Sequence, residues 1–167
     1  MAALKQKGDL AELKVAADLL LRGCQLSFPF GEDCDYDLIA DYAGLLHRVQ
    51  VKFTQSDGHR ILVRCRSHSL TKGKIRRTKY YTAKTVDWIA VYDPTTDRCY
   101  YCPSSELGSG RSELSLRITP ARNGQNFGIR YAGDYTEPDL TRLPVAAVEP
   151  AGIEPATSCL QSTRSAN

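Results

Sequence analysis

The sequence predicts an α/β fold: a mixed sheet of four or five strands with an N-terminal helix packed on one face. Three observations support this prediction. The segment 9–22 has the apolar spacing of an amphipathic helix, and the segments 36–42 and 45–54 read as two strands around the turn Ala43-Gly44. The run Trp88–Tyr92 has the length and composition of a buried strand.

The predicted helix runs from Asp9 to Arg22. Asp9 is a favourable N-cap residue, and Glu12 follows three residues later, as in a capping box. Gly23 suits the left-handed conformation that ends many helices. The apolar residues at helical spacing, expected to face the sheet, are Leu13, Ala16, Ala17, Leu20 and Leu21.

The remaining elements follow from shorter patterns. Further strands are predicted at Cys24–Phe30, Arg60–Arg66 and Arg98–Pro103, with weaker candidates at Leu114–Thr119 and Gly128–Tyr131. The polar, basic stretch Ser67–Lys84 contains Gly73 and is predicted to be a loop that leads into a short helical turn.

The length of 167 residues suits one domain, which we place at residues 1–143. Residues 144–167 contain three prolines, few charges and no periodicity, and are predicted to be a disordered tail. No apolar run reaches the roughly 20 residues of a membrane span, and the N-terminus lacks the apolar core of a secretory signal. We therefore expect a cytoplasmic protein that does not bind membranes, with its six cysteines as thiols.

Positive charge is concentrated in one part of the chain. The net charge is only +3, but the segment Arg60–Lys84 holds nine lysine or arginine residues and no acidic residue. Such a cluster attracts a polyanion, although it can also be a solvated surface. The candidate nucleic-acid contacts in it are Arg60, Arg64, Arg66, Lys72, Lys74, Arg76, Arg77, Lys79 and Tyr80; Tyr80 and Tyr81 are equally consistent with anchoring the segment to the core.

The two predicted strands around Ala43-Gly44 place three polar side chains on one face of the hairpin. If the turn is centred between these residues, paired positions sum to 87, so Asp37 lies opposite Gln50 and on the same face. Lys52 lies two residues beyond Gln50 and shares that face. A carboxylate, an amide and an ammonium group thus gather on one side of the hairpin, while Val49 and Val51 point the other way.

Phosphodiester hydrolysis needs such a set. A hard divalent cation prefers oxygen ligands and neutralises charge on the phosphate. Asp37, Gln50 and the Val51 carbonyl can supply these ligands, with Glu12 added from the helix, and Lys52 can hold the attacking water or the transition state.

Simpler interpretations of these residues stay open. Glu12 can be only a capping residue, Asp37 a solvent-facing residue at a strand start, and Gln50 and Lys52 the wet face of a half-exposed strand. The pair Cys99 and Cys102 lacks the second pair of ligands that a zinc site needs, so we expect strand thiols there.

Asp37 followed by Gln50-Val51-Lys52 resembles the motif of the PD-(D/E)XK nuclease superfamily, with glutamine in place of the usual acid. Glu12 resembles the helical acidic residue of many members. The segments 31–33, 86–94 and 128–132 narrow the resemblance to its intron-encoded homing endonuclease branch of cyanobacterial type, a Gln-x-Lys variant. The resemblance covers about residues 5–136.

The resemblance implies a restriction-endonuclease-like core and a catalytic set of Glu12, Asp37, Gln50 and Lys52. It implies site-specific double-strand DNA cleavage with Mg²⁺, or Mn²⁺ as an alternative. Each chain carries one site, so at least a homodimer is expected, and the resemblance implies a tetramer. The alternatives are a Holliday-junction or restriction-type nuclease on the same fold, and a non-catalytic nucleic-acid-binding module.

Overall fold

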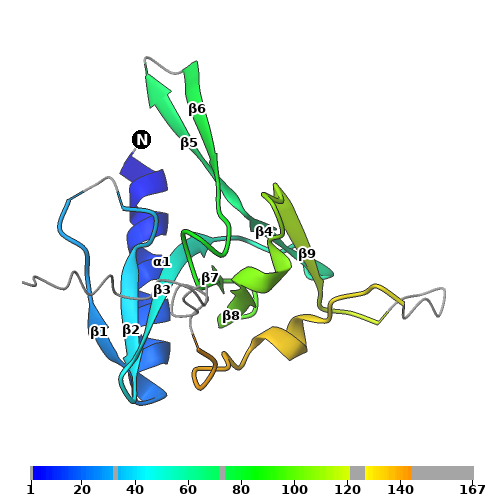
Figure 1. The fold of residues 1–167 in the computed structure, drawn as a ribbon. Coiled ribbons are helices and arrows are strands. Elements are labelled where there is room, and N and C mark those ends of the chain that lie inside the picture. The colour runs from blue at the N-terminus through cyan, green and yellow to red at the C-terminus, as the bar shows by residue number, and fades with distance from the viewer. Residues whose placement is uncertain (1, 32–33, 72–73, 121–126, 144–167) are drawn as a thin grey trace, which may run out of the picture.

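A computed structural model describes residues 2–31, 34–71, 74–120 and 127–143 (Figure 1). The α-helix is α1 (Ala2–Leu21), and two short 3-10 helices are η1 (Ser104–Glu106) and η2 (Ala132–Tyr135). The strands are β1 (Gln25–Ser27), β2 (Leu38–Tyr42), β3 (Leu45–Phe53), β4 (Arg60–Arg64), β5 (Arg66–Thr71), β6 (Lys74–Tyr80), β7 (Trp88–Asp93), β8 (Arg98–Pro103) and β9 (Glu113–Arg117). The predicted tail, residues 144–167, lies outside the described residues.

The main sheet is mixed and five-stranded, in the order β1-β2-β3-β7-β8. Strands β3 and β7 are parallel, and the other neighbours are antiparallel. Helix α1 packs on one face of this sheet (Figure 1). The predicted α/β class, strand number and helix position are therefore confirmed.

Helix α1 starts earlier than the sequence predicts. It begins at Ala2, so Asp9 lies inside the helix and is not an N-cap, and the capping-box interpretation of Glu12 is wrong. Gly8 lowers helix stability by about 1 kcal/mol relative to alanine, but the surrounding alanine, leucine and lysine residues favour the helix. The predicted C-terminus is confirmed, because Gly23 has φ +86°.

Two hydrogen bonds close this end of α1. The Gly23 amide donates to the Leu20 carbonyl (3.0 Å) and the Cys24 amide to the Leu19 carbonyl (3.1 Å), which is the Schellman pattern. The turn sends the chain directly into β1, which is shorter than the predicted strand.

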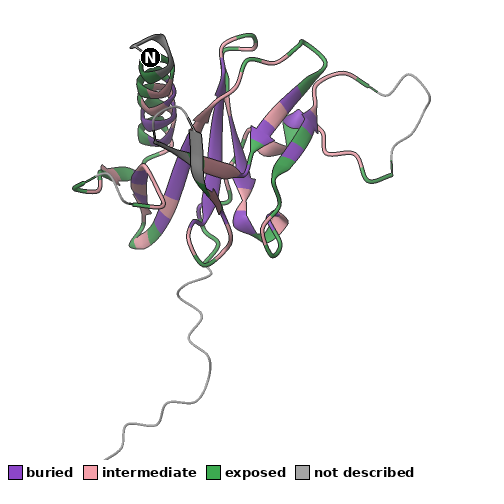
Figure 2. Ribbon diagram, turned by 90° about the horizontal axis from the view of Figure 1, so that it is seen from above, coloured by how far each residue is buried: buried purple, intermediate pink, exposed green. Residues whose placement is uncertain are grey.

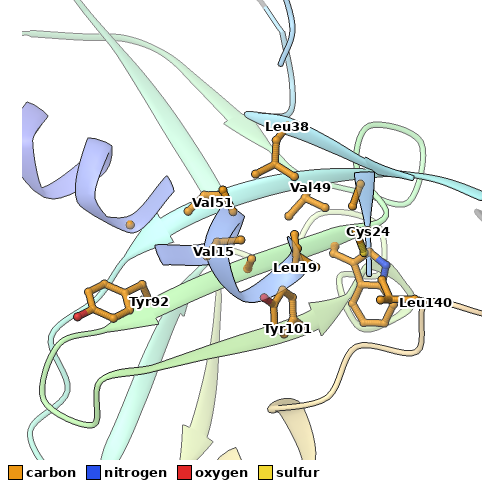
Figure 3. Packing of buried hydrophobic residues seen from close by; sticks show 14 residues of the cluster. Val15, Leu19, Cys24, Leu38, Val49, Val51, Tyr92, Tyr101 and Leu140 are labelled. Atoms are coloured by element: carbon orange, nitrogen blue, oxygen red, sulfur yellow. The ribbon is translucent and has the colours of Figure 1, made fainter. Parts of the chain in front are cut away.

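The buried face of α1 also differs from the prediction. Ala11, Val15 and Leu19, at i, i+4 and i+8, are buried together with Ala16, and they pack on Val49 and Val51 of β3 (Figure 3). Of the predicted stripe only Ala16 is buried; the four exposed members are Leu13, Ala17, Leu20 and Leu21. The helix carries apolar residues on both sides, so periodicity alone could not choose the side that meets the sheet.

The β2–β3 hairpin has the predicted register. Leu38 pairs with Val49 and Tyr42 with Leu45, so paired positions sum to 87. Ala43 and Gly44 have φ of +52° and +87°, as a two-residue turn of type I′ requires. Glycine adopts this conformation without strain, which fixes the turn at this point of the chain.

A second core covers the other face of the main sheet. Strands β4 and β9 pair as an antiparallel ribbon whose inner residues, among them Ile61, Val63 and Leu116, are fully buried against Ile89 and Val91 of β7. Strand β7, which lies between the two cores, is buried along its whole length, whereas the ends of β3 are partly exposed (Figure 2). Within the predicted strand Arg60–Arg66, the residues Ile61, Val63 and Cys65 are buried, whereas Arg60 and Arg64 are exposed.

The predicted loop at Ser67–Lys84 is instead the antiparallel hairpin β5–β6, which projects away from the body of the protein (Figure 1). The sequence of this segment is mostly polar and charged and shows no apolar alternation, so it gave no signal for a strand. The weak strand candidate Gly128–Tyr131 is also wrong: a single bridge joins Tyr131 to Arg117. No helix within the described ranges is long and apolar enough to cross a membrane.

Candidate active site

Asp37 lies at the entrance to the β2–β3 hairpin. It precedes β2, and its amide donates to the Val49 carbonyl (2.9 Å), which extends the ladder by one residue. This extension brings Asp37 opposite Gln50, as the register arithmetic predicts. Gln50 is buried, with 6% of its surface exposed, so the wet-face interpretation of this residue is wrong.

The Asp37 carboxylate is held against the backbone and side chains of β3. The Val51 amide donates to Asp37 Oδ2 (2.7 Å), and Gln50 Nε2 donates to the same oxygen. Gln50 Nε2 also donates to the Val51 carbonyl (3.3 Å). A partly positive amide nitrogen therefore lies between a carboxylate oxygen and a carbonyl oxygen.

Lys52 extends from the same face of β3 as Gln50. Its ammonium nitrogen donates to the hydroxyl of Tyr81 (3.1 Å) and lies 5.0 Å from the centre of the Tyr81 ring. Tyr81 is itself buried, and its amide donates to the Cys65 carbonyl (3.0 Å). A fixed phenol thus orients the flexible lysine.

Glu12 reaches this site from α1. Partial burial raises its pKa, and the negative charges of Asp37 and Asp9 raise it further, while Lys52 lowers it. The charges of Asp37 and Lys52 therefore act on Glu12 through space. The four predicted residues lie on α1, just before β2, and on β3, and hydrogen bonds or electrostatic interactions link them.

Burial raises the pKa of Asp37 as well. The Val51 amide, Lys52 and Gln50 act in the opposite direction, but burial is the larger effect. Two carboxyl groups with raised pKa values that repel each other are a common feature of functional sites, because a bound cation can relieve both the burial and the repulsion.

The donor set fits a hard divalent cation. Gln50 Nε2, between Asp37 Oδ2 and the Val51 carbonyl, lies where a cation would contact both oxygens. Glu12 adds a second carboxylate. No group of three or more acidic, histidine or cysteine residues gathers anywhere in the described part of the chain, so such a site would rely on amide and backbone oxygens as well.

Comparison with known proteins assigns the family. The sequence profile described as PD-(D/E)XK endonuclease matches residues 2–138, most of the chain. The chain belongs to the PD-(D/E)XK endonuclease family. No curated protein matches the chain.

Two solved structures resemble this PD-(D/E)XK protein. The structure of the bacterial homing endonuclease I-Ssp6803I is 26% identical, with a TM-score of 0.63, covering 78% of this chain and 86% of that one. The Holliday junction resolvase Hjc from Archaeoglobus fulgidus is 12% identical, with a TM-score of 0.41, covering 66% of this chain and 84% of that one. The restriction-endonuclease-like fold and the family resemblance found in the sequence are confirmed.

The predicted DNA contacts of this PD-(D/E)XK nuclease lie on two ribbons. Arg60 and Arg64 are exposed on β4, and Arg66, Arg77 and Tyr80 lie on β5–β6. Lys74 and Arg76 belong to the part of β6 whose side chains are not described, and Lys72 lies outside the described residues. Lys79 forms an ion pair with Asp35, in the segment before β2.

Two of these features were missed in the sequence. The partner of Lys79 could not be predicted, because Asp35 and Lys79 are distant in the chain and only the fold brings them together. The sequence also left the role of Tyr81 open. Its neighbour Tyr80 is 43% exposed whereas Tyr81 is 3% exposed, so the two tyrosines face opposite ways. Alternation along β6 is the signal that could have separated them.

The cysteine prediction is confirmed for the pair in β8. Cys102 is buried and Cys99 is partly buried, and both are free thiols. Burial raises the pKa of Cys99 to about 12. These thiols stay protonated at neutral pH and belong to the two cores.

Proposed function

We propose that this nuclease is a divalent-metal-dependent endonuclease that makes double-strand breaks at a specific DNA site, in the manner of a homing endonuclease. The observation that carries the proposal is the Gln50 amide nitrogen held between Asp37 Oδ2 and the Val51 carbonyl. The charges of Glu12, Asp37 and Lys52 act on one another, which supports an acid-rich cation site with one positive group.

The cation that best suits these oxygen donors is Mg²⁺, with Mn²⁺ as an alternative. Its ligands would be Asp37, Glu12, the Val51 carbonyl and, once its amide turns, the Gln50 side-chain oxygen. When bound, the metal would withdraw charge from the scissile phosphate and lower the pKa of a water molecule.

The side chains of the protein would perform the remaining steps. Lys52 would donate a hydrogen bond to the attacking water or to the negative phosphate oxygens as charge develops. Tyr81 would keep the ammonium group in place. The Val51 amide would hold the Asp37 carboxylate in one orientation, so that little reorganisation accompanies the reaction.

Site specificity is supported by the 26% identity to a homing endonuclease over 78% of the chain. The basic ribbons support binding to double-stranded DNA, because arginine and lysine residues contact phosphate groups and base edges. A protruding two-stranded ribbon such as β5–β6 also has the dimensions to enter the major groove.

A homo-oligomer follows from the number of sites. One chain carries one candidate site, whereas cutting two strands needs two, so we propose at least a dimer, with a tetramer as the larger alternative. Leu13, Leu20 and Leu21 of α1 are 70%, 56% and 89% exposed and offer an apolar surface to a second copy. The Leu13→Lys/Leu20→Lys variant should sediment as a smaller species than the wild type; unchanged mass would place the interface elsewhere.

Cleavage of plasmid libraries carrying random inserts tests the function. The wild-type protein should linearise selected plasmids with Mg²⁺ and none with EDTA, and sequencing of the ends should recover one recurrent site. The Asp37→Ala variant should cut none. Cleavage in EDTA would overturn the metal requirement, and ends scattered over unrelated sequences would overturn the site specificity.

A further inference from the structure

A groove of about 470 Å³ lies between the β4–β9 ribbon and the segment 128–130. It is far richer in positive than in negative side chains. Its charged and titratable lining consists of His59, Arg60, Arg111, Arg117 and Arg130, with the single acid Glu113. It is separate from Asp37, Gln50 and Lys52, none of which line it.

Two of these arginines oppose each other directly. Arg60 of β4 pairs in register with Arg117 of β9, and the residues next to them, Ile61 and Leu116, are fully buried. Arg60 and Arg117 therefore point to the outer face of the ribbon, with Cβ atoms about 4.5–5.5 Å apart. Like charges in this position destabilise a sheet, unless an anion lies between them.

Internal carboxylates balance only part of this charge. Arg130 pairs with Glu106, and Arg60 lies 3.6 Å from Asp57 in an exposed ion pair. Arg117 donates through Nε to the Thr119 carbonyl (3.1 Å), which fixes its guanidinium group without neutralising it. Among the described residues, neither Arg117 nor Arg111 forms an ion pair.

Arg111 connects the groove to the base of the β5–β6 hairpin. It follows Gly110, whose φ is +130° and where an added Cβ would lie 3.4 Å from the Cβ of Tyr80. A larger residue at 110 would be strained and would press on this tyrosine. Arg111, which lines the groove, therefore lies close to the base of the hairpin.

We infer that this groove binds phosphate groups of duplex DNA, as a contact surface additional to the β5–β6 hairpin. The inference rests on the proposed function, because it takes the DNA substrate as the ligand. Guanidinium groups bind phosphate oxygens through paired, charge-assisted hydrogen bonds. A phosphate held by Arg60 and Arg117 removes their mutual repulsion, and Arg111 can take a neighbouring phosphate on the way to the hairpin.

A salt titration of DNA binding tests the inference, with Ca²⁺ in place of Mg²⁺ to suppress cleavage. If Arg111 and Arg117 each neutralise one phosphate, the Arg111→Gln/Arg117→Gln variant should flatten the slope of log K against log salt by about 1.8. The loss of affinity between 50 and 200 mM salt should then be about twelvefold smaller than for the wild type.

Two matched variants isolate the effect. Arg98→Gln/Arg142→Gln removes the same charge from exposed arginines outside the groove and should leave the slope unchanged. Arg111→Lys/Arg117→Lys keeps the charge and should keep the slope. Equal flattening in the Arg98/Arg142 variant, or no flattening in the groove variant, would overturn the inference.

The melting temperature of the free protein checks the fold. Since Arg60 and Arg117 repel each other, the Arg117→Gln change should leave the melting temperature unchanged or raise it. If the melting temperature falls, the salt titration is done with the Arg111→Gln variant alone, whose slope should be flatter by about 0.9. Wild-type cleavage with an unchanged slope in the variants would reject the groove and keep the proposed function, whereas a wild type that neither binds nor cuts DNA would reject both.

Discussion

The ammonium nitrogen of Lys52 lies 3.1 Å from the hydroxyl oxygen of Tyr81, above the ring of the same tyrosine. Lysine side chains are flexible, and an ammonium group without a fixed partner spends little time in one position. Tyr81 is buried and contacts the ammonium group through both its hydroxyl and its ring, although Tyr81 itself is not part of the superfamily motif. We therefore assign Tyr81 as a positioning residue for Lys52.

The Tyr81→Phe variant should cut DNA about ten- to a hundredfold more slowly, since a hydrogen bond to a charged group contributes about 1.5–3 kcal/mol. The ring remains, so affinity for DNA should not change. The measurement is the single-turnover cleavage rate at saturating protein. The matched control is Tyr100→Phe, which removes the hydroxyl of another buried tyrosine, one that donates to Thr96 (3.0 Å). Equal rate losses in the two variants would indicate a general effect on stability.

Asp37 and Lys52 have separate roles that one pair of variants can test. Asp37→Ala removes the central carboxylate, and Lys52→Ala removes the positive group, so each should reduce cleavage at least a thousandfold. Binding to DNA in EDTA should change less than threefold, because the proposed phosphate contacts lie on the basic ribbons. Asp134→Asn, an exposed acid on η2, serves as the control. Full cleavage by either site variant would remove that residue from the catalytic set.

Gln50 stands where most of the superfamily carries an acid. The Gln50→Glu change brings a third carboxylate beside Asp37 in a buried position, which is unfavourable without a cation. We expect this variant to melt at a lower temperature than the wild type in EDTA, to recover with Mg²⁺, and to retain cleavage. Gln50→Leu should melt normally and cut poorly. A Gln50→Glu protein that is indifferent to Mg²⁺ would show that the metal does not contact position 50.

Turn and strand patterns in the sequence predicted part of this site. The rest depends on packing between segments that are distant in the chain. The turn at Ala43-Gly44 fixes the register of its hairpin, so the opposition of Asp37 and Gln50 followed from the sequence. The buried face of α1 did not, because Leu13 and Val15 are equally plausible core residues until the sheet is in place. The contact between Lys52 and Tyr81 also depends on the whole fold, because the two residues are far apart in the sequence.

The ion pair between Lys79 and Asp35 predicts an unequal contribution from the lysines and arginines of β6. Lys79 is already neutralised, so Lys79→Gln should change the salt slope of DNA binding less than Arg77→Gln does. Asp35→Asn should release Lys79 and steepen the slope by about 0.9, if the freed charge then contacts a phosphate. These slopes are measured as for the groove variants. A flatter slope in Asp35→Asn would mean that Asp35 holds Lys79 in place for DNA instead of competing with it.

The raised pKa of Asp37 predicts that the ionised carboxylate lowers the free energy of unfolding of the metal-free protein. Burial is the main cause, and it outweighs the Val51 amide, Lys52 and Gln50. A carboxyl group whose pKa is higher in the folded than in the unfolded chain binds more protons when folded. The free energy of unfolding must therefore fall as pH rises from the ordinary value of 3.8 through the raised one.

Asp37→Asn removes this charge and keeps an oxygen that can accept from the Val51 amide. In EDTA at pH 7 the variant should therefore melt at a higher temperature than the wild type, and the difference should shrink as pH falls towards 3.8, where Asp37 is protonated. Adding Mg²⁺ should raise the melting temperature of the wild type and leave the variant nearly unchanged, because the cation stabilises the ionised carboxylate. Thermal melts across pH, with and without Mg²⁺, provide the measurement. A variant that melts below the wild type in EDTA at pH 7 would mean that the hydrogen bonds and Lys52 outweigh burial, and that the ionised carboxylate stabilises the fold without a metal.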